Sequence, residues 1–280
     1  MANTSEIEWT EATWNPTTGC SKISPGCKNC YAEKLSKRLK AMGVKKYKNN
    51  FQFTEQPNDL ELPFLWKKPK KIFVNSMSDL FHEEARMEYV ASCFHTMIQA
   101  NWHIFQILTK RSQKMVQFSE LFENYFGDYI PPHVWMGVSV ENKDYVKRID
   151  DLRNVKCHTR FISFEPLIGP VGKLNLKEID WAIIGGESGF GYRSVKKEWI
   201  LDIINQCKKQ KVAVFFKQWG GIRPKSGGRK INRRTYDEYP LIKKSENILK
   251  EVEFDEKAFA EFCVSQTKRK IKEKQTIPIV

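Results

Sequence analysis

The 280-residue chain lacks any apolar run close to the roughly 18 residues that a membrane-spanning helix needs. Its first residues, MANTSEIEWTEATWN, lack the basic start and apolar core of a signal peptide. These absences argue against a membrane or secreted protein, so the sequence predicts a soluble, cytoplasmic one. Hydrophobic residues make up 41% of the chain, which is enough to form a folded core.

Acidic residues are under-represented, and one long stretch has none. The chain carries 47 basic and 33 acidic residues, and no acidic residue lies between Ile203 and Tyr236. Phe215, Phe216 and Trp219 lie among the basic residues of that stretch. Basic residues with interleaved aromatics suit phosphate contact and base stacking, so the sequence predicts a nucleic-acid partner, with a solvated surface as the alternative. The candidate nucleic-acid-binding residues in the second half of this stretch are Arg223, Lys225, Arg229, Lys230, Arg233 and Arg234.

Histidine is scarce and forms no familiar metal-binding motif. The chain has five histidines and no HExxH spacing, which argues against a zinc hydrolase. Four of the seven cysteines are scattered singly and are predicted to be small buried residues, namely Cys93, Cys157, Cys207 and Cys263. The other three lie within GCSKISPGCKNCYAEK with the spacing C-x6-C-x2-C, and the nearest histidine in sequence is His82.

The clustered cysteines, Cys20, Cys27 and Cys30, allow three interpretations. A disulfide with a spare thiol suits an oxidising compartment rather than the cytoplasm. A structural zinc takes four ligands and would need a distant fourth one. Three thiolates with one open position fit a [4Fe-4S] cluster whose fourth iron binds a small molecule.

Short apolar segments alternate with helical patterns along most of the chain. The apolar segments are rich in β-branched and aromatic residues, as parallel strands covered on both faces are. The sequence therefore predicts an α/β fold, a partial (β/α) TIM-like barrel of about six parallel strands over residues 1–221, with a basic, charged and peripheral C-terminal extension at 222–280. Strands are expected near 72–75, 103–108, 134–138, 160–162, 181–184 and 212–216, and helices near 83–100, 112–126, 143–154, 196–209 and 257–274.

Polar residues follow the carboxyl ends of the expected strands. Sites are built at this edge in parallel α/β proteins. The cysteine loop is expected there too, because WTEATWNP before it can end in a first strand and YAEKLSKRLKAM after it can form a helix. The alternative is that these residues are buried polar groups bonded to nearby backbone. The candidate site residues at these strand ends are Ser76, Ser78, Asp79, Lys110, Ser139, Glu141, Asn142, Glu165, Gly185, Gly186 and Glu187.

The three-cysteine loop followed by Tyr31, on an alternating β/α chain, resembles the radical S-adenosylmethionine enzymes. Their usual spacing is C-x3-C-x2-C, from which this chain departs. The segments WNPTTGCSKISPGCKNCYAE, FVNSMSDLFHE, FQILTKR, VWMGVSVEN, FISFEPL, WAIIGGESG and FFKQWGG are similar to a phage- and prophage-associated family of unknown function. That family carries a three-cysteine motif and loosely resembles spore photoproduct lyase.

The resemblance implies a [4Fe-4S] cluster on Cys20, Cys27 and Cys30, with S-adenosylmethionine chelating the open iron. It also makes the site residues at the strand ends, from Ser76 to Glu187, candidates for binding that cofactor. Reductive cleavage of that cofactor would generate a 5′-deoxyadenosyl radical, with Tyr31 as a candidate hydrogen-atom relay. The substrate would be nucleic acid or a nucleotide, with Arg111, Lys217 and Gln218 as candidate nucleic-acid-binding residues that contact its phosphate. A three-cysteine-motif protein is a further candidate partner. The alternative is a non-catalytic nucleic-acid-binding protein, in a phage or defence setting, with a structural cluster or zinc.

Overall fold

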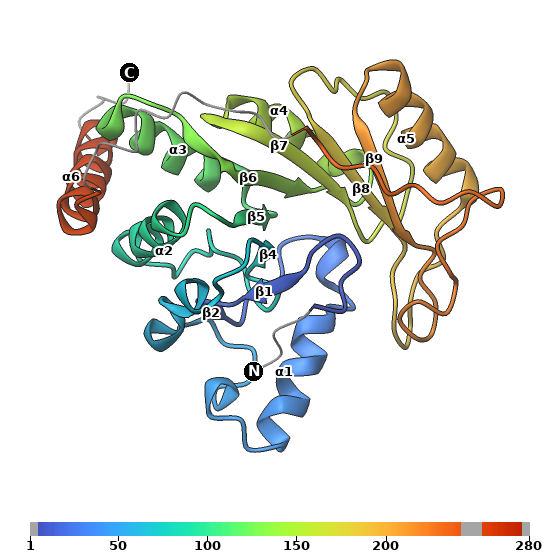
Figure 1. Cartoon of the computed structure of the whole chain (residues 1–280), viewed down its shortest axis with the longest axis horizontal. Helices are drawn as coiled ribbons and strands as arrows, with labels where there is room; N and C mark the ends of the chain where they lie inside the picture. The colour runs from blue at the N-terminus through green and yellow to red at the C-terminus, as the bar shows by residue number, and fades with distance from the viewer. Residues whose placement is uncertain (1–4, 242–253, 276–280) are drawn as a thin grey trace.

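A curled sheet of parallel strands forms the centre of the molecule (Figure 1). The computed structural model describes residues 5–241 and 254–275. All neighbouring strands of the sheet pair in parallel, which confirms the predicted α/β partial barrel. In sheet order the seven strands are β1 (Ala12–Trp14), β4 (Lys71–Val74), β5 (Ile104–Thr109), β6 (Ile130–Ser139), β7 (Cys157–Phe164), β8 (Trp181–Gly185) and β9 (Ala213–Gln218).

Helices cover the outer side of the curled sheet (Figure 1). They lie between successive strands because parallel strands need a crossover connection. The helices are α1 (Tyr31–Ala41), α2 (Met87–Gln99), α3 (Ser112–Phe126), α4 (Lys147–Asn154) and α5 (Lys197–Lys209). The smaller elements are β2 (Thr17–Thr18) paired with β3 (Thr54–Glu55), and the 3-10 turns Pro25–Cys27, Lys45–Tyr47, Pro57–Asp59, Leu62–Leu65 and Lys143–Tyr145.

Side chains alternate between the two faces of the sheet, and both faces are packed. The helix-covered face carries residues such as Val74, Met136 and Phe164. The opposite face, which we call the inner face, carries a separate cluster of aromatic side chains. The members of that cluster are Trp9, Phe73, Trp135, Phe161, Trp181, Ile183 and Phe215. Apolar burial on both faces explains why the strands read as continuous hydrophobic runs.

The C-terminal extension joins the sheet, so it is less peripheral than its sequence suggests. The backbone N–H of Phe216 donates to the Tyr236 carbonyl, and the N–H of Glu238 donates to the Val214 carbonyl. This short segment runs antiparallel to β9, as the bridge between Phe215 and Asp237 shows. It covers an edge whose backbone groups would otherwise be open to pairing with another chain.

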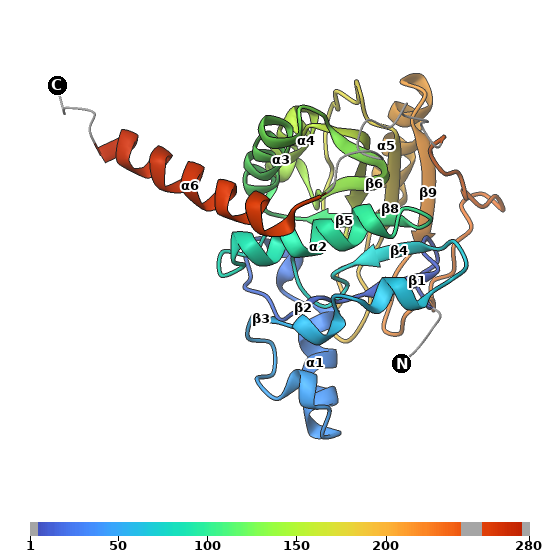
Figure 2. The ribbon, with the colours of Figure 1, turned by 60° about the vertical axis from the view of Figure 1, so that its left-hand side comes forward.

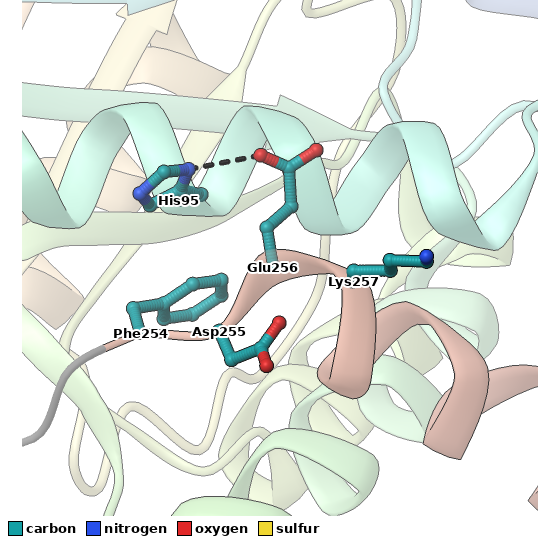
Figure 3. Close-up of a pocket in the computed structure, with 5 residues that line it drawn as sticks. All are labelled: His95, Phe254, Asp255, Glu256 and Lys257. Carbon is teal, nitrogen blue, oxygen red and sulfur yellow. Dashed lines mark hydrogen bonds and ion pairs between the residues drawn. The ribbon is translucent and has the colours of Figure 1, made fainter.

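The last helix, α6 (Glu256–Gln275), packs on α2 and α3 and then runs outward (Figure 2). Phe259 and Cys263 on its first turns are fully buried. Figure 3 shows how the helix begins: Glu256 points to His95 of α2, with 2.9 Å between the carboxylate and Nδ1. Phe254 stacks on the same imidazole ring. Residues 242–253 and 276–280 of the predicted extension lie outside the described residues.

Candidate functional site

The loop that carries the three cysteines lies at the carboxyl end of the sheet. It starts at Gly19, whose backbone N–H donates to the Met77 carbonyl just beyond β4. It ends at Cys30, the residue before α1. All three cysteines are free thiols of intermediate exposure, whereas the four scattered cysteines are free and buried, as predicted.

A buried ion-pair network holds the first cysteine of the loop. Nη1 of Arg111 lies 3.5 Å from the Cys20 sulfur and 3.0 Å from Oδ2 of Asp79. The same guanidinium donates to the Ser21 hydroxyl at 2.7 Å and to both carboxylate oxygens of Glu83 at 2.8 Å. Burial, and then the Asp79 carboxylate, raise the pKa of Cys20 to about 11. In the metal-free protein this sulfur therefore carries its proton.

The second cysteine has the opposite electrostatic setting. Burial acts to raise the pKa of Cys27, but the Lys110 ammonium and hydrogen bonds from the loop outweigh it, and the net shift is downward. The Ser24 hydroxyl lies 3.6 Å from the Cys27 sulfur and donates to Glu141 at 2.5 Å. Glu141 is fully buried and accepts a second bond from Arg148 at 2.8 Å. Of Cys20 and Cys27, Cys27 is therefore the thiol that ionises more readily.

The turn before Cys27 approaches the sheet closely. A Cβ on Gly26 would lie 2.5 Å from the Glu141 side chain, so only glycine fits there without displacing it. The Ser24–Glu141 hydrogen bond and the close approach of Gly26 to Glu141 hold the cysteine loop against the end of β6. The loop is therefore held in place by residues more than 100 positions away in sequence.

A second contact joins the cysteine loop to the loop after β8. The Asn29 amide donates to Glu187 at 3.0 Å and to the Gly191 carbonyl at 2.8 Å. Arg193 donates to the same carboxylate through its backbone N–H at 2.8 Å and its Nε at 2.9 Å. Burial acts to raise the pKa of Glu187, but the hydrogen bonds from Arg193 and Asn29 outweigh it and lower the pKa. We call Asn29, Glu187 and Arg193 the loop clasp.

The inner face becomes polar toward the carboxyl ends of the strands. Ser139 pairs in register with Ser163, and strand alternation places both on the same side as Trp135 and Phe161. Beyond them, the Lys217 ammonium donates to Glu165 at 2.7 Å. A polar layer therefore lies above the aromatic cluster, on the side that the cysteine loop occupies.

Several predicted binding residues make contacts within the local structure. The Ser76 hydroxyl donates to the Asn15 side chain just after β1, and the Ser78 hydroxyl donates to the Thr17 carbonyl of β2. Asn142 caps the turn that precedes α4 through Asp144. Gly185 lies against Glu165, and a Cβ on Gly186 would clash with the Trp219 carbonyl. Tyr31 donates its hydroxyl to the Ser76 carbonyl at 2.5 Å and is 54% exposed.

The predicted nucleic-acid-binding residues divide into two groups. Arg111 and Gln218 are buried, Lys217 pairs with Glu165, and Arg229 pairs with Asp237. The remaining residues are exposed in the segment after β9, namely Arg223, Lys225, Lys230, Arg233 and Arg234. The acid-free stretch of the sequence thus presents its cations mainly on that segment.

The residues that bond to the predicted site residues and hold the loops together do not stand out in the sequence. Ser24 and Asn29 lie inside the cysteine motif, where polar residues have no distinctive spacing. Arg148 and Arg193 lie beyond the strand ends, in a helix and a loop. A buried carboxylate needs a cation or several donors, so the acidic residues at the strand ends were the available signal that such partners exist.

The donor set suits an iron–sulfur cluster in type and number. Three half-buried thiols lie on one loop, next to Lys110 and Arg111, whose charges favour thiolates. Within residues 5–241 and 254–275, no group of three or more His, Cys, Asp or Glu side chains is arranged to hold a single metal ion. The hollow in Figure 3 is lined by His95 and residues 254–257 at the start of α6 and contains none of these cysteines.

Residues 4–240 match a protein family described as "Protein of unknown function (DUF5131)". The chain belongs to this family. No curated protein matches it. A solved structure of a spore photoproduct lyase double mutant, with bound AdoMet and dinucleoside spore photoproduct, matches at 10% identity and a TM-score of 0.40. That match covers 70% of this chain and 61% of the lyase chain.

No described helix is both long enough and apolar enough to cross a membrane. The predicted phage association and the three-cysteine-motif partner stay predictions.

Proposed function

We propose that this chain is a radical S-adenosylmethionine enzyme that acts on nucleic acid or a nucleotide. The observation that carries the proposal is the loop with three half-buried thiols at the carboxyl end of a curled parallel sheet. Cys20, Cys27 and Cys30 would hold a [4Fe-4S] cluster and leave its fourth iron for the cofactor. When bound, the cluster supplies the electron that cleaves the sulfonium bond of S-adenosylmethionine.

The residues around the loop would prepare the thiols for the cluster. Lys110 lowers the pKa of Cys27 and favours its thiolate. Cys20 must release a proton on binding because its pKa is about 11, and Arg111 lies 3.5 Å away to balance the new charge. Cluster assembly should therefore be faster at higher pH.

The inner face would bind the cofactor and substrate. Ser139, Ser163 and the Glu165–Lys217 pair offer hydrogen-bonding groups below the loop. The buried aromatic cluster beneath them, including Trp135 and Phe161, would help to exclude water from the site. Exclusion of water protects a reactive intermediate from side reactions.

The proposal is tested by anaerobic purification with iron, sulfide and zinc analysis of wild type, Cys27→Ala and Cys207→Ala. We expect about four irons per chain in wild type, as a four-iron cluster requires, and a large loss in Cys27→Ala. Cys207 is buried among the residues of α5 and β9, so its variant controls for the removal of a thiol elsewhere and should keep its iron. One zinc and no iron would overturn the proposal and favour a non-catalytic nucleic-acid-binding protein with a structural metal, which the basic stretch also supports.

A further inference from the structure

The loops that follow β8 and β9 lie side by side at the carboxyl edge of the sheet (Figure 1). The backbone N–H of Gly189 donates to the Gly221 carbonyl at 2.8 Å, and the N–H of Gly221 donates to the Glu187 carbonyl at 3.0 Å. These bonds continue the pairing of the two strands into their loops. The two loops therefore form one surface, which we call the rim (residues 188–193 and 221–226).

The rim presents an aromatic side chain at the tip of a tight turn. Phe190 is 86% exposed, and glycines with positive φ flank it on both sides. The turn closes with a bond from the Tyr192 N–H to the Gly189 carbonyl. Ile222 on the second loop of the rim is also exposed, at 63%, so the rim presents more than one large apolar side chain. Grouped apolar side chains at the surface suit contact with a partner.

The turn is held firmly against the cysteine loop. Lys34 of α1 donates to the Phe190 carbonyl at 3.2 Å, and Asn29 donates to the Gly191 carbonyl at 2.8 Å. Glu187 of the loop clasp fixes the start of the same segment. A turn whose backbone is held in place before binding loses little backbone conformational entropy when a partner stacks on its exposed ring.

Basic side chains lie on the second loop of the rim. Arg223 and Lys225 are exposed, two and four residues beyond the bridge at Gly221. The Lys225 ammonium lies 3.7 Å from the carboxylate of Glu8, which comes from the start of the chain. The stretch from Ile203 to Tyr236 itself contains no acidic residue. The exposed ring and these cations match the two features of a single nucleic-acid strand, its bases and its phosphates.

We propose that the rim binds single-stranded nucleic acid, with a base stacked on Phe190 and phosphates on Arg223 and Lys225. The proposal deepens the proposed function and rests on it for the substrate class, since a strand on the rim passes beside the cysteine loop. A duplex keeps its bases stacked on one another, so it offers no free base to Phe190. Single strands should therefore bind more tightly than duplexes of the same sequence.

The test is fluorescence anisotropy with a labelled mixed-sequence DNA 12-mer and an RNA of the same sequence, as single strands and as duplexes. It uses the full chain without S-adenosylmethionine or reductant, so failure of the cluster proposal and failure of this one are distinguishable. Phe190→Ala should weaken single-strand binding at least about fivefold, since one stacked base contributes about 1–3 kcal/mol. The R223A/K225A double variant should flatten the slope of log K against log salt by about 1.4, since each phosphate contact contributes about 0.7.

Lys147→Glu is the matched control, because this exposed lysine begins α4 on the helix-covered side. It should change affinity less than twofold, and thermal unfolding should show that all variants fold, since the altered side chains are exposed. Unchanged single-strand affinity in Phe190→Ala, equal loss in Lys147→Glu and the double variant, or tighter binding of duplex would each overturn the proposal. A rim that recognises a protein would give the first of these results.

Discussion

Lys110 and Asp79 shift the pKa values of two cysteines of the same loop in opposite directions. Lys110 lowers the pKa of Cys27, whereas burial and Asp79 raise that of Cys20 to about 11. The thiolate is the reactive form of cysteine. The two sulfurs should therefore differ in reactivity although only six residues lie between them in the sequence.

In the metal-free protein, we expect iodoacetamide to modify Cys27 well before Cys20. Between pH 7 and 8.5 the Cys27 rate should exceed the Cys20 rate by at least about tenfold, because a difference of one pKa unit is a factor of ten in ionisation. Peptide mapping by mass spectrometry after timed quenching measures both rates in one sample.

The control for this difference is Lys110→Gln, which removes the ammonium and should slow Cys27 without speeding Cys20. Equal rates for the two cysteines in wild type would contradict the assigned electrostatics.

At the scale of elements, the loop clasp joins the cysteine loop to the loop after β8. Glu187 is 5% exposed and accepts bonds from Asn29 and Arg193. Because its pKa is lowered in the folded state, its stabilising effect is present above the pKa of an unfolded glutamate, about 4.3, and is lost as the pH falls through the lowered value.

Glu187→Gln should lower the free energy of unfolding at pH 7 by about 1.5–3 kcal/mol, the usual contribution of hydrogen bonds to a charged group. The difference from wild type should stay constant from pH 6 to 8 and shrink below about pH 4, where the wild-type carboxylate becomes protonated. Urea unfolding at several pH values measures this. Glu61→Gln, at an exposed glutamate, should change stability little, and a Glu187→Gln effect that grows in acid would contradict the clasp.

Most helices and strands were predictable because the apolar residues follow clear helical or strand spacing. The helix at Ser112–Phe126 has the predicted bounds. The helix expected from residue 143 begins at Lys147, because Asn142 caps a separate 3-10 turn first. The strand ends also pointed to Asp79, Glu141 and Glu187. Their partners were not predictable, because pairs such as Ser24 and Glu141 are formed by the tertiary fold and leave no local pattern.

At the scale of the whole molecule, the C-terminal helix belongs to the folded core. Phe259 is fully buried, and the centroid of its ring lies 6.0 Å from that of Phe118 and 5.9 Å from that of Phe122 on α3. The sequence suggested a charged, peripheral tail because few apolar residues stand out among the charges of α6. Those few apolar residues are the ones that are buried against the rest of the protein.

Phe259→Ala should therefore destabilise the chain by about 3–5 kcal/mol, as truncation of a buried phenylalanine does. Lys257→Ala, at an exposed position two residues earlier, should change stability by less than about 0.5 kcal/mol. Denaturant unfolding followed by tryptophan fluorescence compares the two variants. Equal stability of Phe259→Ala and wild type would show that α6 does not stabilise the rest of the chain.

The central claim is that the three-cysteine loop supports reductive cleavage of S-adenosylmethionine. The most direct measurement is 5′-deoxyadenosine formed by the anaerobically purified, reduced protein in the presence of S-adenosylmethionine, followed by chromatography and mass spectrometry. We expect product in wild type and Cys207→Ala and none in Cys27→Ala. No 5′-deoxyadenosine from a wild-type preparation that contains four irons per chain would contradict the claim.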